Sequence, residues 1–570
     1  MSGSIGIDFG TSNSVAATWR PGGVEVLSID SPLGEWENLG FDRIMPSVFA
    51  EGKDGQALFG WAAKRAETGR FEAVKRLFAT QQESIVDDAG SVFALEEVST
   101  MLFAELKAAA ARQGVDARQA VITVPANSRG LARHRTKICA GMGGFQVLAL
   151  LNEPTAAAMA YAARNPGDQQ VLVFDWGGGT LDVTILQSVD GVFLEQASKG
   201  LPTKGGLDFD TRLRKLLLDT IPDTSGWTPA QRHRFNLDVE LAKIRLSQQE
   251  FTVVQLPDGE SRRVTQGMFE EAVKPLIEEA RRPIAQCLAD IGAGPGAVDA
   301  VVMVGGTSKI PAVRRFVADL LEREPAVGID PMTAVGEGAA IAAAVLAGDL
   351  DTNDFFVATE HALGTIAVHP ATNELTFSEI IPRNHKLPAS KTETFRPLTA
   401  EQDRWTIQVI EGDPSMPLGH PDNVVLQEFH VRWQPGRPDR TLDMTYEYDV
   451  DGILHISVRD NISDTVIHTG EISFGVTADR RKLVEMSRRA RQAVATGQVG
   501  AEQPEAASAL DPDAVKLLQE AEVKVIPFLS DDEAAPVKAA VAALRAADAE
   551  ALAGHKARLR EALAPYSYLL

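Results

Sequence analysis

Two segments of the sequence place an aspartate at the end of an apolar run, directly before a turn of small residues. Asp8 precedes Gly-Thr-Ser-Asn at 10–13, and Asp175 precedes Gly-Gly-Gly-Thr at 177–180. Glycines in such a turn let backbone N–H groups approach phosphate oxygens, because no Cβ is in the way. An aspartate would repel a phosphate, so it suits Mg²⁺ held through water. The two segments therefore predict a site for a triphosphate and its metal ion.

A single turn of this kind would usually be an ordinary surface hairpin, so the repetition matters. Each segment has an apolar strand, the aspartate, the small-residue turn and a second apolar strand. Two such units indicate two lobes of similar fold that face each other and clamp one ligand. The chain contains no G-x-x-x-x-G-K-[ST] string, so it is not a P-loop protein.

The elements that must position these turns follow an α/β pattern over residues 1 to about 350. Apolar runs at 121–124, 171–174 and 300–304 alternate with helical patterns. Short alternating strands then predict a β domain, with a hairpin at Asp451 and Gly452. The chain turns helical from Thr477, with a flexible break expected at 494–512 and an apolar helical set in 532–564.

Composition excludes several classes of protein. The 570 residues are too many for one ordinary domain, and 78 acidic against 56 basic residues give a net charge of −22. A chain this acidic is a poor partner for nucleic acid. No apolar run is long enough to span a membrane, and we expect no signal peptide. The two cysteines, Cys139 and Cys287, are expected to be buried and unpaired, which fits the cytoplasm.

The sequence resembles the DnaK-type heat-shock 70 chaperones over nearly its whole length. The matching strings occur in the family's order and at its spacing, and they cover residues 6–14, 120–126, 151–161, 174–182, 205–210, 302–311, 409–413 and 449–460. The resemblance implies an actin-like two-lobed α/β ATPase domain at 1–350 and an interdomain linker at 351–360. A β-sandwich peptide-binding domain at 361–475 and a short α-helical lid at 476–570 would follow.

The resemblance also implies the catalytic residues. Lys75 matches the lysine near the γ-phosphate, whose charge can stabilise phosphoryl transfer; without the resemblance it would be interpreted as a solvated lysine. Asp182 matches a carboxylate that holds a monovalent cation, K⁺, and Asp8, Glu153 and Asp175 match positions around the hydrated Mg²⁺. Thr180 completes the catalytic set. From the residues alone, Glu153 could simply cap the helix that follows it.

The implied nucleotide-binding residues come from several separate segments. Glu240, Lys243 and Ser247 match the nucleoside-binding helix, and their spacing of three and four places them on one face. The remaining ATP-binding residues belong to the two phosphate turns, a second glycine pair and the turn beneath the adenosine, and they are Gly10, Thr11, Ser12, Asn13, Gly177, Gly178, Gly179, Thr180, Gly205, Gly206, Gly305, Gly306, Ser308 and Lys309. Lys309 replaces an arginine that stacks on adenine, so weaker adenine affinity is expected.

Two groups of residues are implied to couple nucleotide state to the rest of the chain. Pro125 and Arg133 match a pair that relays nucleotide state outward, although Pro125 could be only a strand terminator. Phe355, Phe356 and Val357 match a linker that docks on the ATPase domain.

The peptide-binding positions depart from the family. Val368 and Leu398 align with the arch over the peptide, and Trp405 aligns with a small aliphatic residue on the pocket floor. An indole there would fill much of a leucine-sized pocket. Alternatively, a shifted loop turns Trp405 elsewhere.

Three functions compete. The first is an ATP-dependent chaperone that binds ATP/ADP, Mg²⁺ and unfolded or extended client polypeptides, together with a J-domain co-chaperone and a nucleotide exchange factor. Ala149 in place of a basic residue, and an acidic residue displaced to Glu360, argue against ordinary J-domain docking. The second is a small-molecule kinase, which would not carry the β domain. The third is an ATP-binding switch or scaffold with a narrowed client site.

Overall fold

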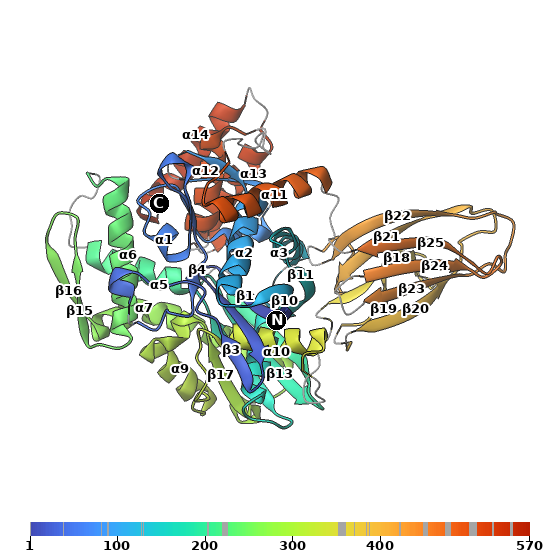
Figure 1. The fold of residues 1–570 in the computed structure, drawn as a ribbon, viewed down its shortest axis with the longest axis horizontal. Helices are drawn as coiled ribbons and strands as arrows, with labels where there is room; N and C mark the ends of the chain where they lie inside the picture. The colour runs from blue at the N-terminus through green and yellow to red at the C-terminus, as the bar shows by residue number, and fades with distance from the viewer. Residues whose placement is uncertain are drawn as a thin grey trace.

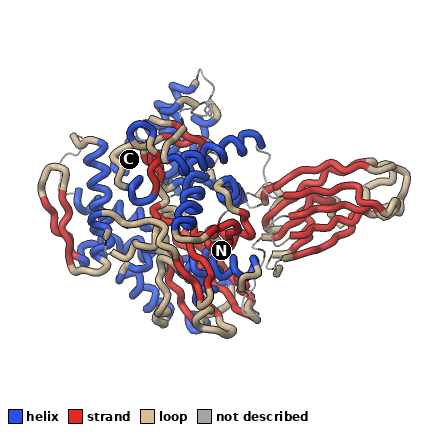
Figure 2. The backbone as a smooth tube through the Cα atoms, viewed as in Figure 1, coloured by secondary structure: helices blue, strands red, loops and turns tan. Residues whose placement is uncertain are grey.

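The computed structural model describes residues 2–37, 39–80, 82–87, 90–126, 128, 130–201, 204–218, 226–350, 359, 361–369, 371–383, 385–386, 388–420, 423–448, 454–472, 480–500, 510–526, 529, 531–547 and 551–569. These residues form a mixed α/β protein with several sheets, as the sequence predicts. A module built only of strands projects from a larger body in which helices and strands alternate (Figure 2).

The first large sheet of the body contains the Asp8 segment. Its strand order is β11 (Gln146–Asn152), β10 (Asp116–Val124), β1 (Ser2–Phe9), β2 (Asn13–Arg20) and β3 (Gly23–Val26), and β4 (Met45–Pro46) also pairs with β2. β1 runs parallel to β10 and antiparallel to β2. The turn 10–13 therefore joins two strands of one hairpin.

The second large sheet contains the Asp175 segment and repeats this topology. Its order is β14 (Val192–Leu201), β13 (Leu181–Val189), β12 (Gln170–Trp176) and β17 (Ala300–Val304). β12 runs parallel to β17 and antiparallel to β13, as β1 does with β10 and β2. The predicted internal repeat is thus a pair of matching hairpins in two sheets of related topology.

Helices surround both sheets. Those of the first half are α1 (Gly60–Lys64), α2 (Leu95–Arg112), α3 (Gly130–Met142) and α4 (Glu153–Ala162), and those of the second half are α5 (Gly206–Leu218), α6 (Pro229–Leu246), α7 (Gln266–Glu279), α8 (Arg281–Asp290) and α9 (Pro311–Leu321). α10 (Ala334–Ala347) packs against β1, β2 and α4. Its residues 334–344 are all buried, which explains its Ala- and Gly-rich composition.

Short elements extend the first half. A three-stranded sheet has the order β6 (Ala57–Phe59), β5 (Phe49–Glu51) and β7 (Arg70–Phe71), and β8 (Ser84–Val86) pairs with β9 (Val92–Ala94). Between them lies the 3-10 helix η3 (Val74–Ala79), which carries Lys75. The second half adds the hairpin of β15 (Phe251–Gln255) and β16 (Ser261–Thr265).

The strand module consists of two four-stranded sheets that share one core. The strand order of the first sheet is β19 (Leu375–Ile381), β18 (Ala362–Val368), β21 (Arg404–Gly412) and β22 (Val424–Arg432). The strand order of the second sheet is β20 (Ala389–Phe395), β23 (Leu442–Tyr448), β24 (Leu454–Asp460) and β25 (Thr465–Ile472). Tyr446 is buried, and its hydroxyl donates to Gly364 O of the other sheet at 2.9 Å. The predicted hairpin residues Asp451 and Gly452 lie outside the described residues, although Tyr448 pairs with Leu454.

Helix α11 (Arg480–Thr496) lies on α2 and α3 of the larger body (Figure 1). Arg489 pairs with the buried carboxylate of Glu97, with 2.9 Å between Nε and Oε1, and Ser487 Oγ donates to Met142 O at 2.7 Å. The predicted break at 494–512 is wrong at its start. α11 continues to Thr496, and residues 497–499 then pair with residues 55–57 through backbone hydrogen bonds. Residues 501–509 lie outside the described part.

The last helices form a small unit with its own core. α12 (Pro512–Gln519), α13 (Asp531–Arg545) and α14 (Leu552–Leu563) bury the predicted apolar residues Val537, Val541, Leu544, Leu559 and Leu563. α12 contacts β8, where Gln519 Oε1 accepts a hydrogen bond from Val86 N at 2.9 Å. Both cysteines are free and buried, as predicted. No helix among the described residues is long and apolar enough to cross a membrane.

Candidate functional site

The two small-residue turns meet between the two large sheets. A Cβ added to Gly178 would lie 2.2 Å from Ser12 Oγ, so only glycine permits this approach. Gly179 O accepts a hydrogen bond from Arg76 Nη2 of the first half at 3.0 Å. The structure therefore brings together Ser12, Gly178 and Gly179, which the sequence assigned to phosphate binding from segments far apart in the chain.

The second turn is held by the other predicted glycine pairs. Gly206 N donates to Gly177 O at 2.9 Å, and Thr307 Oγ1 donates to the same oxygen at 2.9 Å. Gly305 has φ +80°, and a Cβ there would meet Trp176 O at 2.3 Å. The carbonyl groups of the turn are thus tied down, and Gly177 N itself donates to Thr180 O at 3.1 Å. Among the described residues, the N–H groups of Gly178 and Gly179 are left as the donors for an anion.

Four carboxylates and one lysine gather beside these turns. Lys75 Nζ lies 2.8 Å from Glu153 Oε1, and both side chains are largely buried. Thr123 Oγ1 donates to Asp8 Oδ1 at 3.1 Å, while Thr180 Oγ1 donates to Asp182 Oδ2 at 3.1 Å. All six predicted catalytic residues are therefore linked by contacts or by charge.

Burial and mutual repulsion disfavour the charged forms of these acids. Burial raises the pKa of Asp8 to about 7, with a further increase from Glu153 and an opposing effect of Lys75. The pKa of Asp175 is also raised well above its usual value, first by burial and then by the charges of Glu153, Asp182 and Asp8. Because like charges this close are costly, the site favours a bound cation.

The donor set fits a hydrated divalent cation. Across the described ranges, no three acidic, histidine or cysteine groups converge closely enough to ligate a metal ion directly. Carboxylates set back from the ion suit Mg²⁺, which keeps several of its water ligands. Asp8, Glu153 and Asp175 are the residues that would hold such an ion. When bound, it neutralises charge on phosphate oxygens.

Two of the predicted nucleoside-binding residues, Glu240 and Lys243 of α6, form ion pairs, and Ser247 at the end of the helix makes a hydrogen bond. Glu240 Oε2 lies 2.8 Å from Lys64 Nζ of α1, so this pair joins the two halves. Burial raises the pKa of Glu240, but Lys64 and Lys243 outweigh it and leave that pKa below its usual value. Lys243 Nζ pairs with Asp210 Oδ2 at 2.8 Å, and Ser247 Oγ donates to Lys243 O at 3.3 Å.

A cavity of about 670 Å³ opens between the halves at this point. Thr11, Ser12, Arg76 and Glu240 line it, together with Gln519 of α12. The volume suits a nucleotide-sized ligand, but the residues that line the cavity do not include Lys75, the carboxylate cluster or the turn 177–180. Sequence reasoning missed Arg76 although it follows Lys75 directly; it also missed Gln519, for which no local pattern exists.

The turn assigned to the adenosine is partly at the surface. Lys309 Nζ pairs with Asp330 Oδ1 at 3.0 Å, and both side chains are partly exposed. Ser308 is buried, and its Oγ has no hydrogen-bond partner among the described residues. Ser308 Oγ is thus a buried polar atom that no described residue satisfies, in the turn that the sequence assigned to the adenosine.

Arg133 connects the carboxylate cluster with the strand module. It is 4% exposed, and its Nη1 donates to Asn152 Oδ1 at 2.9 Å, one residue before Glu153. Its Nε lies 4.0 Å from Glu411 Oε1 on β21. Pro125 directly follows β10 and is half-buried. The linker residues Phe355, Phe356 and Val357 lie outside the described residues.

Two of the three predicted peptide-binding residues, Val368 and Trp405, lie at strand ends, and Leu398 lies in the loop between β20 and β21. Trp405 is half-buried on the same side of β21 as Ile407, and its ring lies 5.2 Å from that of Phe395 on the other sheet. The pairing of β18 with β21 ends at Thr365 and Val409, so Val368 and Trp405 both lie beyond it. Leu398 is 68% exposed.

Paired phosphate turns, buried acids and a lysine, set between two α/β halves, are the features of a nucleotide-hydrolysing protein. A family model described as Hsp70 protein matches residues 4–567. Chaperone protein DnaK of Thermotoga neapolitana is 34% identical over 513 residues, which cover 84% of this chain and 81% of that protein. Chaperone protein DnaK of Thermosipho africanus is 33% identical over 511 residues, with the same coverage.

The chain therefore belongs to the Hsp70 family. It is an ATP-dependent molecular chaperone and an ATPase, and the family uses ATP and ADP with Mg²⁺.

The buried acids predict how metal and pH affect nucleotide binding. Asp8→Asn combined with Asp175→Asn removes two charges that favour a cation, so Mg²⁺-dependent ATP affinity and turnover should both fall.

The raised pKa of Asp8 also predicts how stability depends on pH. In wild type without nucleotide, between about pH 4 and 7, Asp8 carries a proton in the folded state but has lost it in the unfolded state. Folding stability should therefore decrease as the pH rises through this window, and Mg·ATP affinity should increase.

Titration calorimetry with and without Mg²⁺, and denaturation at several pH values, measure these effects. The exposed Asp258→Asn serves as the matched control. An unchanged Mg²⁺ dependence in the double variant would overturn the assignment of the acids.

Proposed function

We propose that ATP hydrolysis between the two α/β halves, which correspond to actin-like lobes, regulates binding and release of unfolded or extended apolar segments by the strand module. The observation that carries this proposal is the chain of contacts from the reaction centre to β21. Lys75 contacts Glu153, and Asn152 next to it accepts a hydrogen bond from Arg133, which faces Glu411. A change at the γ-phosphate thus has a direct route to the strand module.

The roles of the site residues follow from their chemistry. Lys75 stabilises charge that develops as the γ-phosphate leaves, and Glu153 orients the lysine. Asp182, held by Thr180, supports a K⁺ ion, while the turns 10–13 and 177–180 hold the phosphates through backbone N–H groups. Glu240, Lys243 and Ser247 contact the nucleoside.

The remaining parts act as coupling elements. Residues 1–350 are the ATPase domain, 351–360 the linker, 361–475 the substrate-binding domain and 476–570 the helical lid. Further contacts support coupling, since Arg383 pairs with Glu195 at 2.6 Å and Lys137 Nζ lies 5.6 Å from the centre of the Tyr448 ring. We place the protein in the cytoplasm, with client polypeptides, a J-domain co-chaperone and an exchange factor as partners.

A second candidate is an ATP-binding switch with a narrowed client site. The contact of Trp405 with Phe395 favours it, because two aromatic rings occupy space near the end of β21. The two candidates differ in whether ordinary apolar peptides stimulate hydrolysis.

Peptide stimulation of ATP turnover is the test of the proposed function. An extended apolar peptide should raise steady-state hydrolysis several-fold in wild type. Lys75→Ala should retain ATP binding but lose about two to three orders of magnitude in turnover, typical of one electrostatic donor. Lys53→Ala, at an exposed position, is the control. Turnover of Lys75→Ala within a few-fold of wild type would contradict the role of Lys75, and no peptide response would favour the switch.

The linker provides a separate test of coupling. Docking Phe355 and Phe356 on the ATPase domain would bury two aromatic side chains, each worth about 1.5–3 kcal/mol when fully buried. Replacing both with Asp should leave the domains folded but abolish the acceleration of peptide release by ATP. Stopped-flow release of a fluorescent peptide measures this, and ATP-accelerated release in the variant would place coupling elsewhere.

Trp405 predicts an unusual peptide preference. If its indole narrows the pocket, peptides with a central Ala, Val or Gly should bind better than peptides with a central Leu. Trp405→Val should restore binding of the leucine-centred peptide. Fluorescence polarisation with both peptides and both proteins decides the question. Tight binding of the leucine-centred peptide by wild type, unchanged in the variant, would mean that Trp405 does not line the pocket.

A further inference from the structure

The segment that carries Lys75 has few hydrogen bonds of its own to fix its position. η3 is a six-residue 3-10 helix that begins after Ala73, a non-glycine residue at φ +53°, and no side chain caps its N-terminus. Short 3-10 helices have poor hydrogen-bond geometry, and a left-handed alanine adds strain. The segment must therefore be held from outside if Lys75 Nζ is to stay at Glu153.

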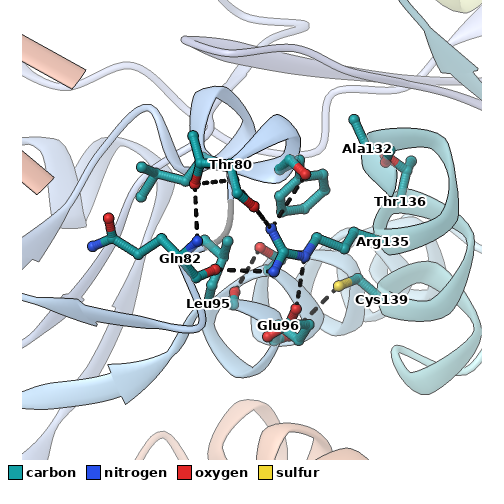
Figure 3. Close-up of polar contacts among 11 residues, drawn as sticks. Thr80, Gln82, Leu95, Glu96, Ala132, Arg135, Thr136 and Cys139 are labelled. Carbon is teal, nitrogen blue, oxygen red and sulfur yellow. Dashed lines mark hydrogen bonds and ion pairs between the residues drawn. The ribbon is translucent and has the colours of Figure 1, made fainter. Parts of the chain in front are cut away.

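One buried guanidinium binds the other end of this segment. Arg135 lies on α3, and its side chain is 9% exposed. Its Nη1 donates to the carbonyl oxygens of Leu77, Phe78 and Thr80 at 3.2, 3.2 and 2.8 Å, and its Nη2 donates to Gln82 O at 3.0 Å. Figure 3 shows these oxygens converging on one side chain.

The remaining donor of the guanidinium is occupied as well. Nε lies 2.9 Å from Glu96 Oε1, at the start of α2. Glu96 thus fixes the orientation of the planar guanidinium. The two terminal nitrogens of Arg135 then face η3 and the residues after it. The last carbonyls of a helix have no partner within the helix and favour a positive charge. Lysine offers no planar fork and could not bind these oxygens together.

From this geometry we infer that Arg135 is a positioning residue for Lys75, which holds η3 so that the lysine stays beside Glu153. The inference rests on the proposed role of Lys75 in hydrolysis. Arg135 does not touch the cavity or the carboxylate cluster; it acts through the backbone of residues 77–82.

The expected effect is a loss of hydrolysis with ATP binding retained. A misplacement of about 1 Å can cost on the order of 100-fold in rate, so Arg135→Lys should slow single-turnover hydrolysis about tenfold or more. The dissociation constant for ATP should change less than about twofold, because the phosphate turns are held by other contacts. Arg118→Lys, at an exposed position, should behave as wild type.

A double-mutant cycle with Lys75→Ala separates positioning from a general structural role. In the Lys75→Ala background, Arg135→Lys should change the residual hydrolysis less than about twofold, because the residue through which it acts is gone. An equal loss in both backgrounds, or an equal loss of ATP affinity, would overturn the inference. So would wild-type hydrolysis by Arg135→Lys.

Two further variants distinguish a failure of the proposed role of Lys75 from a failure of the inference about Arg135. If Lys75→Ala itself hydrolyses ATP normally, the proposed role of Lys75 fails, whatever Arg135 does. Glu96→Gln keeps the carbonyl contacts of Arg135 and removes only its ion pair, so it should slow hydrolysis less than Arg135→Lys does. If Glu96→Gln slows it as much or more, the carbonyl contacts are not what matters, and the inference is overturned.

Discussion

The structure depends on bringing several negative charges into one buried place. Asp8 and Asp175 come from two different sheets. Burial and the nearby Glu153 raise the pKa of both, and Asp182 raises that of Asp175 further. Lys75 offsets part of this repulsion, and small residues let the two turns approach each other. A site of this kind favours a bound cation, which offsets the repulsion that remains.

The carboxylate cluster also connects the reaction centre to the rest of the chain. Asn152 ends β11 and Glu153 begins α4, so a single peptide unit separates a group at the reaction centre from one that contacts Arg133. Arg133 is buried beside Glu411 of the strand module. Arg133 thus lies between Asn152, to which it donates a hydrogen bond, and the carboxylate of Glu411 at 4.0 Å.

Much of this site could be predicted from the sequence because its chemistry is local. An aspartate followed by small residues defines each turn within a few positions, and the repeated unit predicted two related sheets. Arg135 and Gln519 could not be predicted, because their partners lie more than fifty and four hundred positions away. The same reason explains the end of α11, where pairing with residues 55–57 replaces the break that composition indicated. The orientation of Trp405 depends on the partner sheet.

The position of α11 has a consequence for the energetics of the whole chain. Ala490 and Ala493 are buried against the body, and Arg489 is committed to Glu97. A helix face used in this contact cannot cover the strand module at the same time, so the two placements exclude each other. A ligand that binds better with α11 in one placement lowers the affinity of any ligand that binds better with α11 in the other. By thermodynamic linkage, each of the two ligands lowers the affinity of the other by the same factor. A peptide that drew α11 away from the body would therefore weaken, by that same factor, any ligand that binds better with α11 in place.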